Sequence, residues 1–374
     1  MAQPFDVCIR GAGVVGRTLA LLLARDRLRV ALVAGPTAPA AAAADVRAYA
    51  LNAAARALLE SLRGWPIDAF ATAVLGMQVC GDDGGEVNFS AAAQGVPALA
   101  WIVDVPALEA QLTEAVRYQP LVEVVDAPQS AALTVICEGR ASSARAEFGI
   151  DFDVTPYPQR AIAARLVCEK PHGQIARQWF ANNEILAFLP LGGDQGNSVA
   201  IVWSVPQERA AQLLALSPEE FARQLGVASH NALGTLTLDS ERAAWPLQLA
   251  RAVRWVGTHA GKSWALAGDA AHTVHPLAGQ GLNLGLADAA ELAGVLHARD
   301  YWRSVGDLRL LRRYERARKA EVLSMGLATD GLQQLFARGA GPLQALRNWG
   351  MNGFEHSGPL KTWLARQAMG LRRT

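Results

Sequence analysis

The chain has 374 residues, 51% of them hydrophobic, and a formal net charge of +1. This length predicts about two domains, the apolar content allows large cores, and the near-neutral charge gives no general attraction to nucleic acid. The four cysteines form no C-x-x-C pair, which argues against a zinc site and against a disulfide scaffold. The first residues lack the regions of a signal peptide, and no uncharged apolar run reaches the ~20 residues of a membrane-spanning helix. We therefore expect a cytoplasmic protein.

The N-terminal part of the chain has the pattern of an α/β domain. Residues 5–33 contain the strand "FDVCIR", the turn "GAGVVG", the helix "RTLALLLARD" and the strand "RVALV". Apolar spacing then predicts helices at about 52–62 and at 106–116, where Pro106 is suited to a first turn. Strand-like pieces surround the turn "GDDGGE" within 74–90.

The middle of the chain changes to short strands of alternating polarity. The segments "AIAARLVCE", "ARQWFA", "ILAFLPL" and "SVAIVWSV" lie between 152 and 204 and predict a largely antiparallel sheet. A helix capped by Ser217 follows at 217–225. The strand "WALAG" and a helix at 281–297 return to the α/β pattern. We expect an α/β domain from 1–65, 98–150 and 257–330, a β-rich domain from 66–97 and 151–256, and a helical C-terminal region at 331–374.

The first motif that points to a ligand is Gly11-x-Gly13-x-x-Gly16, which follows a strand and opens a helix. In this setting Gly11 permits the tight turn, Gly13 lets the backbone approach a diphosphate, and Gly16 lets helix and strand pack closely. The N-terminus of the helix offers free N–H groups to the phosphates. The competing interpretation is a tight turn without a nucleotide. The carboxylate that normally ends the second strand and binds the ribose is missing, because Ala34 stands there.

The second motif is the stretch "WALAGDAAHTVHPLAGQGLNLGLADAAELAGVL" at 264–296. Its strand delivers Gly268 and Asp269 to a carboxyl edge, where ligands of open α/β sheets collect. Gly279 and Gly281 then begin a helix whose positive end can face a negative charge. One segment thus supplies an acid for hydroxyl groups and a helix end for an anionic ring. A dinucleotide with a hydroxyl-bearing chain and a ring that becomes anionic on reduction fits both, and this ligand is FAD.

Two histidines within this stretch have competing interpretations. His272 could relay a proton, but we favour a hydrogen bond to the backbone of the turn. His275 precedes Pro276, and both are expected near the flavin ring with a conformational role at least as well supported as a catalytic one. The pair at i, i+3 has no third ligand at a suitable spacing, so no metal site is predicted.

At this point the sequence resembles the class A flavoprotein aromatic hydroxylases, and among them the ubiquinone-biosynthesis hydroxylases (the UbiH, UbiF and UbiI group). The stretch 264–296 carries the resemblance, together with "DVRAYALNAAARALLESLRGW" at 45–65, "AFLPLGGDQGNSVAIVWSV" and "LLRRYERARKAE". The resemblance implies a Rossmann-like FAD-binding domain, an inserted antiparallel-sheet substrate domain and C-terminal helices, in a protein of the bacterial cytoplasm. It also implies that NAD(P)H reduces FAD, that O2 then forms a flavin hydroperoxide, and that one oxygen passes to the ring of a polyprenylated phenol. The cofactor carries this chemistry while the protein orients it and excludes water.

The resemblance also implies roles for individual residues. Arg47 would lie beside the flavin or its phosphates, Asp269 would bind the ribityl chain or the diphosphate region, and the backbone of 279–283 would face the pyrimidine ring. The residues expected to bind the cofactor are Gly11, Gly13, Val14, Val15, Gly16, Arg47, Gly268, Asp269, Gly279, Gln280, Gly281, Leu282 and Asn283.

The sequence departs from the family's pattern at three places. Ala34 replaces the ribose acid, Pro106 stands where the family usually has an arginine directed at FAD, and Glu138-Gly139 replaces an Asp-Gly motif. These departures leave a second hypothesis open, a non-catalytic flavin-fold accessory protein with weak or lost FAD binding. A third hypothesis is a hydroxylase of a small soluble aromatic compound.

Residue type alone suggests a role for two further parts of the chain. Aromatic and neighbouring residues of the β-rich domain could line an apolar substrate pocket, although such residues more often form core: Trp179, Phe188, Leu189, Pro190 and Trp203. The tail 339–374 holds five basic residues against one acid. Its apolar residues recur at helical spacing, which predicts either a peripheral membrane contact or a helix packed on its own domain. The family resemblance adds a contact with a quinone-biosynthesis complex as an alternative to the membrane contact.

Overall fold

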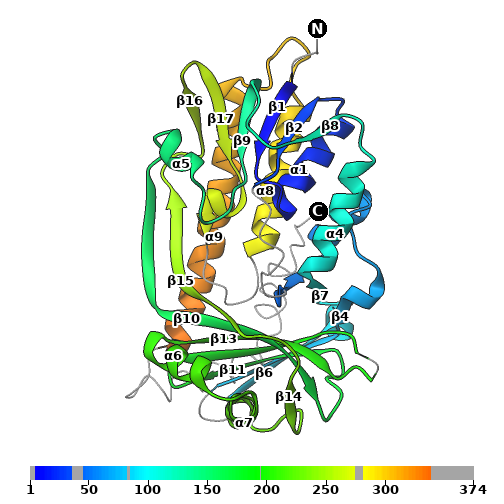
Figure 1. Ribbon diagram of the computed structural model, residues 1–374, viewed down its shortest axis with the longest axis vertical. Helices are drawn as coiled ribbons and strands as arrows, with labels where there is room; N and C mark the ends of the chain where they lie inside the picture. Colours follow the sequence, from blue (N-terminus) through cyan, green and yellow to red (C-terminus); the bar gives the residue numbers. More distant parts are fainter. Residues whose placement is uncertain (1–4, 36–44, 82–84, 194, 274–280, 338–374) are drawn as a thin grey trace.

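The computed structural model describes residues 5–35, 45–81, 85–193, 195–273 and 281–337, with side chains in the last helix described up to residue 323. A six-stranded sheet with its helices occupies one end of the molecule, and a broad curved sheet occupies the other (Figure 1). The long strands β10 (Phe152–Cys168) and β15 (Ala243–Ala252) and the helix α9 (Leu308–Ala337) run from one end toward the other. The mixed α/β architecture agrees with the fold class expected from the sequence.

The six-stranded sheet is mostly parallel, as the strand–turn–helix–strand pattern of 5–33 predicts. Its order is β16-β17-β9-β1-β2-β8, and only the pair β16–β17 is antiparallel. The strands are β1 (Phe5–Arg10), β2 (Val30–Val33), β8 (Val122–Val125), β9 (Ala131–Ile136), β16 (Val256–His259) and β17 (Lys262–Leu266). Short strands made almost wholly of apolar residues are typical of a sheet that is covered by helices.

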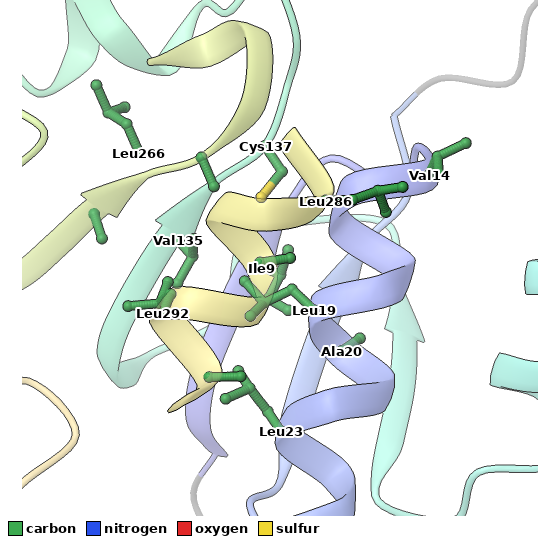
Figure 2. Close-up of a cluster of buried hydrophobic side chains, with 14 of the residues drawn as sticks. Ile9, Val14, Leu19, Ala20, Leu23, Val135, Cys137, Leu266, Leu286 and Leu292 are labelled. Atoms are coloured by element: carbon green, nitrogen blue, oxygen red, sulfur yellow. The ribbon is translucent and has the colours of Figure 1, made fainter. Parts of the chain in front are cut away.

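Helix α1 (Val14–Arg25) packs between α8 (Gly281–His297) and α4 (Val105–Arg117). Helices α1 and α8 lie side by side over the sheet, and their apolar side chains meet those of the strands beneath (Figure 2). The buried residues at this contact are Ile9, Leu19, Leu23, Val135, Leu286 and Leu292. The helices predicted at 106–116 and 281–297 are therefore confirmed, with boundaries within one residue.

The broad sheet has the order β18-β15-β10-β13-β12-β11-β5-β6, and β14 (Leu236–Leu238) pairs with β10. It is antiparallel except for β11 beside β5, which confirms the largely antiparallel sheet predicted for the middle of the chain. Helices α6 (Gln207–Ala215) and α7 (Pro218–Ala228) share a core with it, and the Ser217 hydroxyl caps α7 through the Glu220 N–H as expected. The remaining strands are β5 (Gly76–Cys80), β6 (Glu86–Ser90), β11 (Ile175–Ala181), β12 (Glu184–Pro190), β13 (Ser198–Pro206) and β18 (His272–Thr273).

A three-stranded antiparallel sheet joins the two larger sheets. It consists of β3 (Ala48–Leu51), β7 (Ala100–Asp104) and β4 (Ala71–Val74). Trp101 and Val103 belong to the core of the six-stranded sheet, whereas Ile102 belongs to a cluster with residues of β11 and β13. Within the segment 66–97, β5 and β6 join the broad sheet while β4 pairs with β7. The domain boundaries given above stay a prediction.

The short elements lie at the connections between these sheets. They are α2 (Ala53–Ser61), α3 (Ala91–Gln94), α5 (Ala144–Glu147) and the 3-10 turns η1 (Asp68–Phe70) and η2 (Gly268–Ala270). No helix among the described residues has the length and apolar character needed to span a membrane. The predicted amphipathic tail at 339–374 lies outside the described residues.

A buried carboxylate holds together the elements that surround the second glycine turn. Asp288 of α8 is fully buried and accepts hydrogen bonds from the Gly268 N–H at 2.9 Å, from His272 Nε2 at 2.7 Å and from Arg318 Nε at 2.7 Å. Burial acts to raise the pKa of Asp288, but His272 and Arg318 outweigh it and hold this pKa below its ordinary value. The side chain of His272 therefore bonds to a carboxylate, not to the backbone as we expected, and its role here is structural.

We expect Asp288→Asn to lower the free energy of unfolding by about 3–5 kcal/mol, because the change leaves the buried guanidinium of Arg318 without its counter-charge. The measurement is urea unfolding of both proteins at pH 7. Since the folded pKa of Asp288 is lowered, its contribution is complete above the unfolded value of ~3.9 and is lost as the pH falls through the folded value. Glu60→Gln, in an exposed ion pair with Arg56, is the control and should cost under ~1 kcal/mol. A variant as stable as the parent protein would contradict this role.

Candidate functional site

The first glycine turn combines two tightly packed glycines with one that faces open space. Gly11 has φ +108°, and a Cβ placed there would lie 2.5 Å from the carbonyl oxygen of Cys137. A Cβ on Gly16 would lie 1.9 Å from the carbonyl oxygen of Gly11. A Cβ on Gly13 would meet nothing within 4 Å, and Gly13 is the N-cap of α1. The free N–H groups at the start of α1 thus lie beside a glycine that leaves room for an anion.

The second glycine turn packs directly on the first helix. Gly268 has φ +65°, which glycine adopts without strain, and it begins the turn that carries Asp269. A Cβ on Gly268 would lie 3.3 Å from the Val15 side chain, and one on Gly285 would lie 2.8 Å from it. Val15 of α1 therefore fills the space between the turn after β17 and the start of α8. The two glycine motifs, more than 250 residues apart in sequence, lie side by side in the fold.

Asp269 presents a carboxylate that the described residues leave without a hydrogen-bond donor. Burial raises the pKa of Asp269, and the neighbouring His272, Arg140 and Arg47 only partly offset this effect. A carboxylate in this state is destabilising when ionised. It would gain stability from a ligand that donates hydroxyl groups to it.

Arg47 lies near Asp269, as its electrostatic effect on that carboxylate shows, but a closer acid holds its side chain. Its guanidinium donates to both oxygens of Asp45, with Nε 2.8 Å from Oδ1 and Nη2 2.5 Å from Oδ2. These hydrogen bonds outweigh burial and raise the pKa of Arg47. The side chain of Arg47 is still 42% exposed, so its outer edge can reach a ligand.

Asn283 connects the start of α8 to the strand that carries Tyr49. Its amide donates to the Ala50 carbonyl at 2.8 Å and accepts from the Asn52 N–H at 2.9 Å. Leu282 packs against the core, and Val14 is buried. Four expected site residues, His275, Pro276, Gly279 and Gln280, lie outside the described residues. Among all residues that the structure describes, no group of histidine, cysteine and acidic side chains is arranged to hold a metal ion.

The Glu138-Gly139 segment, one of the departures from the family's pattern, is firmly held. Glu138 accepts from Arg10 Nε at 2.9 Å, from the Ser142 hydroxyl at 2.8 Å and from the Ala144 N–H at 3.0 Å. Burial acts to raise the pKa of Glu138, but these donors outweigh it and lower the pKa. Arg145 donates to the carbonyls of Gly139 and Ala270, which ties this segment to the Asp269 turn. The longer acid thus has a structural role in this segment. Its effect on FAD binding stays a prediction.

A cavity of about 130 Å³ lies between the three-stranded sheet and the broad sheet. Many of its lining side chains are small and apolar, among them Ala48, Ala50, Ala163, Ala187 and Ala200. Arg47 and Tyr49 line it as well, and the burial-raised pKa of Tyr49 also reflects the nearby Asp269. The cavity therefore extends from the neighbourhood of Asp269 into the broad sheet.

The aromatic residues considered for a pocket lining do not line this cavity. Trp179, Phe188 and Trp203 are buried in the core shared with α6 and α7. Pro190 is buried at the end of β12 and does not line the cavity either. Successive residues of a strand face opposite sides, so the cavity receives Ile185, Ala187 and Leu189 where the core receives Leu186 and Phe188. Of the residues named from sequence, only Leu189 faces the cavity.

The chain matches known proteins along its length. The model of the FAD binding domain family matches residues 118–325. The chain is 32% identical to "Ubiquinone hydroxylase UbiL" of Rhodospirillum rubrum, over 98% of this chain and 89% of that protein. It is 30% identical to "3-demethoxyubiquinol 3-hydroxylase" of Escherichia coli, over 99% of both.

Two solved structures share the fold. PqsL of Pseudomonas aeruginosa, in complex with 2-aminobenzoylacetate, has a TM-score of 0.75 at 23% identity and covers 94% of this chain and 100% of its own. The p-nitrophenol 4-monooxygenase PnpA of Pseudomonas putida has a TM-score of 0.75 at 20% identity and covers 100% of both chains. The family match and the two relatives lead to one conclusion: the chain belongs to the FAD-binding family of class A flavoprotein hydroxylases, which are FAD-dependent monooxygenases.

Proposed function

We propose that this protein hydroxylates the aromatic ring of a polyprenylated phenol in ubiquinone biosynthesis, using FAD, NAD(P)H and O2. The observation that carries this proposal is the end-to-end similarity to a relative named 3-demethoxyubiquinol 3-hydroxylase, which covers 99% of both chains. A small apolar cavity beside the Asp269 turn supports it, because a ring to be oxidised must lie next to the flavin and away from water.

The residues of the two glycine turns fit FAD. Gly13 leaves room for a diphosphate at the N-terminus of α1, and Asp269 offers hydroxyl groups a carboxylate that accepts no hydrogen bond from the described residues. We assign the diphosphate to 11–16, the hydroxyl-bearing chain to Asp269, and the ring region to the start of α8 and to Arg47. Bound FAD supplies the redox chemistry, accepting a hydride from NAD(P)H and activating O2.

The protein's own contribution is orientation and exclusion of water. Asn283 fixes the start of α8 against β3. Because Tyr49 and Ala50 of β3 line the cavity, this contact sets the distance between the cavity wall and the flavin site. Val15 fixes the Asp269 turn against α1. The apolar walls of the cavity keep water from the ring that reacts.

The charges of the cavity favour a phenol over a small aromatic acid. Arg47 is engaged by Asp45, and Arg177 donates to the carbonyl of His172 at 3.0 Å. Neither guanidinium is thus fully available to a substrate carboxylate. The non-catalytic alternative loses one of its three supports, because Glu138 keeps the local hydrogen bonds intact.

The direct test is hydroxylation by the purified full-length protein. With FAD, NAD(P)H and O2, a phenol with a short prenyl chain should gain one oxygen by mass spectrometry. Ala187→Phe fills the cavity from β12 and should reduce the hydroxylation rate at least roughly tenfold while FAD binding is kept, since overpacking costs ~1–3 kcal/mol. Val167→Phe adds the same ring at an exposed position outside the cavity and should change neither. Turnover of a small hydroxybenzoate but of no prenylated phenol would contradict the proposal.

Asp269→Asn should stabilise the protein without FAD and weaken FAD binding. Because burial raises the folded pKa of Asp269, the ionised carboxylate opposes folding once the pH exceeds the unfolded value of ~3.9, and the penalty persists above the folded value. The Tm of the FAD-free variant should therefore exceed that of the parent at pH 7 and approach it in acid. The Kd for FAD should rise about tenfold, as expected for a lost hydrogen bond to a charged group. Asp151→Asn, at an exposed position, is the control. An unchanged Kd would remove Asp269 from the site.

Gly13 and Gly16 allow binding to be separated from folding. Gly13→Ala should leave the Tm of the FAD-free protein within ~2 °C of the parent, because its Cβ meets only open space, yet it should weaken FAD binding by crowding the diphosphate. Gly16→Ala should unfold or strongly destabilise the protein, because its Cβ would overlap the backbone of Gly11. Thermal unfolding and FAD titration of both variants make the comparison. Undiminished FAD affinity in Gly13→Ala would mean that the cofactor does not approach this turn.

A further inference from the structure

Arg17 is a cation on the helix face that leads back to Gly13. Its backbone N–H donates to the Gly13 carbonyl at 3.0 Å, so Arg17 lies one turn above Gly13 along α1. Its side chain is partly buried. Side chains of a helix lean toward its N-terminus, so the position of Arg17 is suited to a ligand that lies beside Gly13, where a Cβ would meet nothing within 4 Å.

The surroundings of Arg17 supply little counter-charge. Val15 occupies the opposite face of α1, against α8, so Arg17 is on the side of α4. Burial lowers the pKa of Arg17, and Glu109 of α4 is the acid that partly offsets this effect. Glu109 also acts on Arg47, so the two cations share one acid that is bonded to neither. Among the described residues, Arg17 donates no side-chain hydrogen bond and has no carboxylate within 4.0 Å.

Arg10 and Arg318, which are more deeply buried than Arg17, are placed differently. Arg10 is paired with Glu138 and Glu147, and Arg318 is paired with Asp288 and Glu321. Desolvation of a guanidinium is unfavourable unless charged or polar groups compensate it. Arg17 is therefore partly desolvated without a close counter-charge among the described residues, as expected of a group whose main partner is a ligand.

We propose that Arg17 binds the diphosphate of FAD and so supplies the positive charge that the family usually places at position 106. The proposal rests on the FAD site described above. Pro106 is exposed in the first turn of α4 and has no charge to offer, whereas Arg17 approaches the same region from α1. A guanidinium can donate two parallel hydrogen bonds to phosphate oxygens, which suits this task.

The test is FAD titration of the FAD-free full-length protein, followed by flavin fluorescence at several salt concentrations. Arg17→Leu removes the charge but keeps an apolar side chain, and it should raise the Kd for FAD about tenfold or more and flatten its salt dependence. The Kd for riboflavin, which has no phosphate, should not change. Arg25→Leu removes the same charge from the exposed end of the same helix and should leave both Kd values unchanged. Adding Pro106→Arg to Arg17→Leu should recover affinity for FAD.

The outcomes separate this inference from the proposed function. Equal FAD affinity and salt dependence in Arg17→Leu and the parent would overturn it, and so would an equal loss for FAD and riboflavin, which would indicate a structural role. If Pro106→Arg does not restore FAD affinity to Arg17→Leu, the claim that Arg17 supplies the charge missing at position 106 is wrong. A parent protein that binds neither flavin would refute the FAD site itself, and this inference with it.

Discussion

The carboxylate of Asp288 is the contact on which the site depends. It is enclosed within the protein, yet it joins a backbone N–H of the turn after β17, the ring of His272 and the guanidinium of α9. The Trp255 ring stacks on His272 with centroids 4.9 Å apart, which leaves the imidazole one orientation. Such networks are stable only when every member is satisfied, and here each carboxylate oxygen has a charged or backbone donor. The turn that displays Asp269 is therefore fixed from behind.

The glycines of the two motifs have different physical tasks, although they look alike in sequence. Gly11, Gly16 and Gly285 are required by close packing against backbone or against Val15, with or without a cofactor. Gly13 is not required by packing against the described residues, since a Cβ there would meet none of them within 4 Å. A glycine that the fold does not need is the stronger indication of a ligand. The same distinction separates Asp288, satisfied within the protein, from Asp269, which the described residues leave unpaired.

Local signals predicted most of the fold, because periodicity and caps act within one element. The helices at 52–62, 106–116 and 281–297 and the antiparallel middle segment all follow from spacing, Pro positions and Ser217. The family motifs also predicted that the turns of Gly13 and Asp269 lie at one site. The direction of Trp179, Phe188 and Trp203 could not be predicted, because it depends on which face of the sheet α6 and α7 cover. The role of Asp288 was not predicted, although an acid between two alanines of an apolar helix is itself a signal of a buried partner.

Departures from a family pattern can change where a charge comes from without removing the charge. At Glu138 the acid is longer by one methylene, yet it accepts hydrogen bonds from Arg10, from the Ser142 hydroxyl and from the Ala144 N–H. Groups such as Asp269 and Arg17 lower the stability of the protein when no ligand is bound, because each is desolvated with little compensation. A ligand that binds only the folded state restores that stability through mass action. Asp269 and Arg17, which the described residues leave without a close counter-charge, would therefore tie the stability of this domain to its cofactor. Sequence motifs alone do not reveal such a coupling, because it depends on which charges have a partner in the fold.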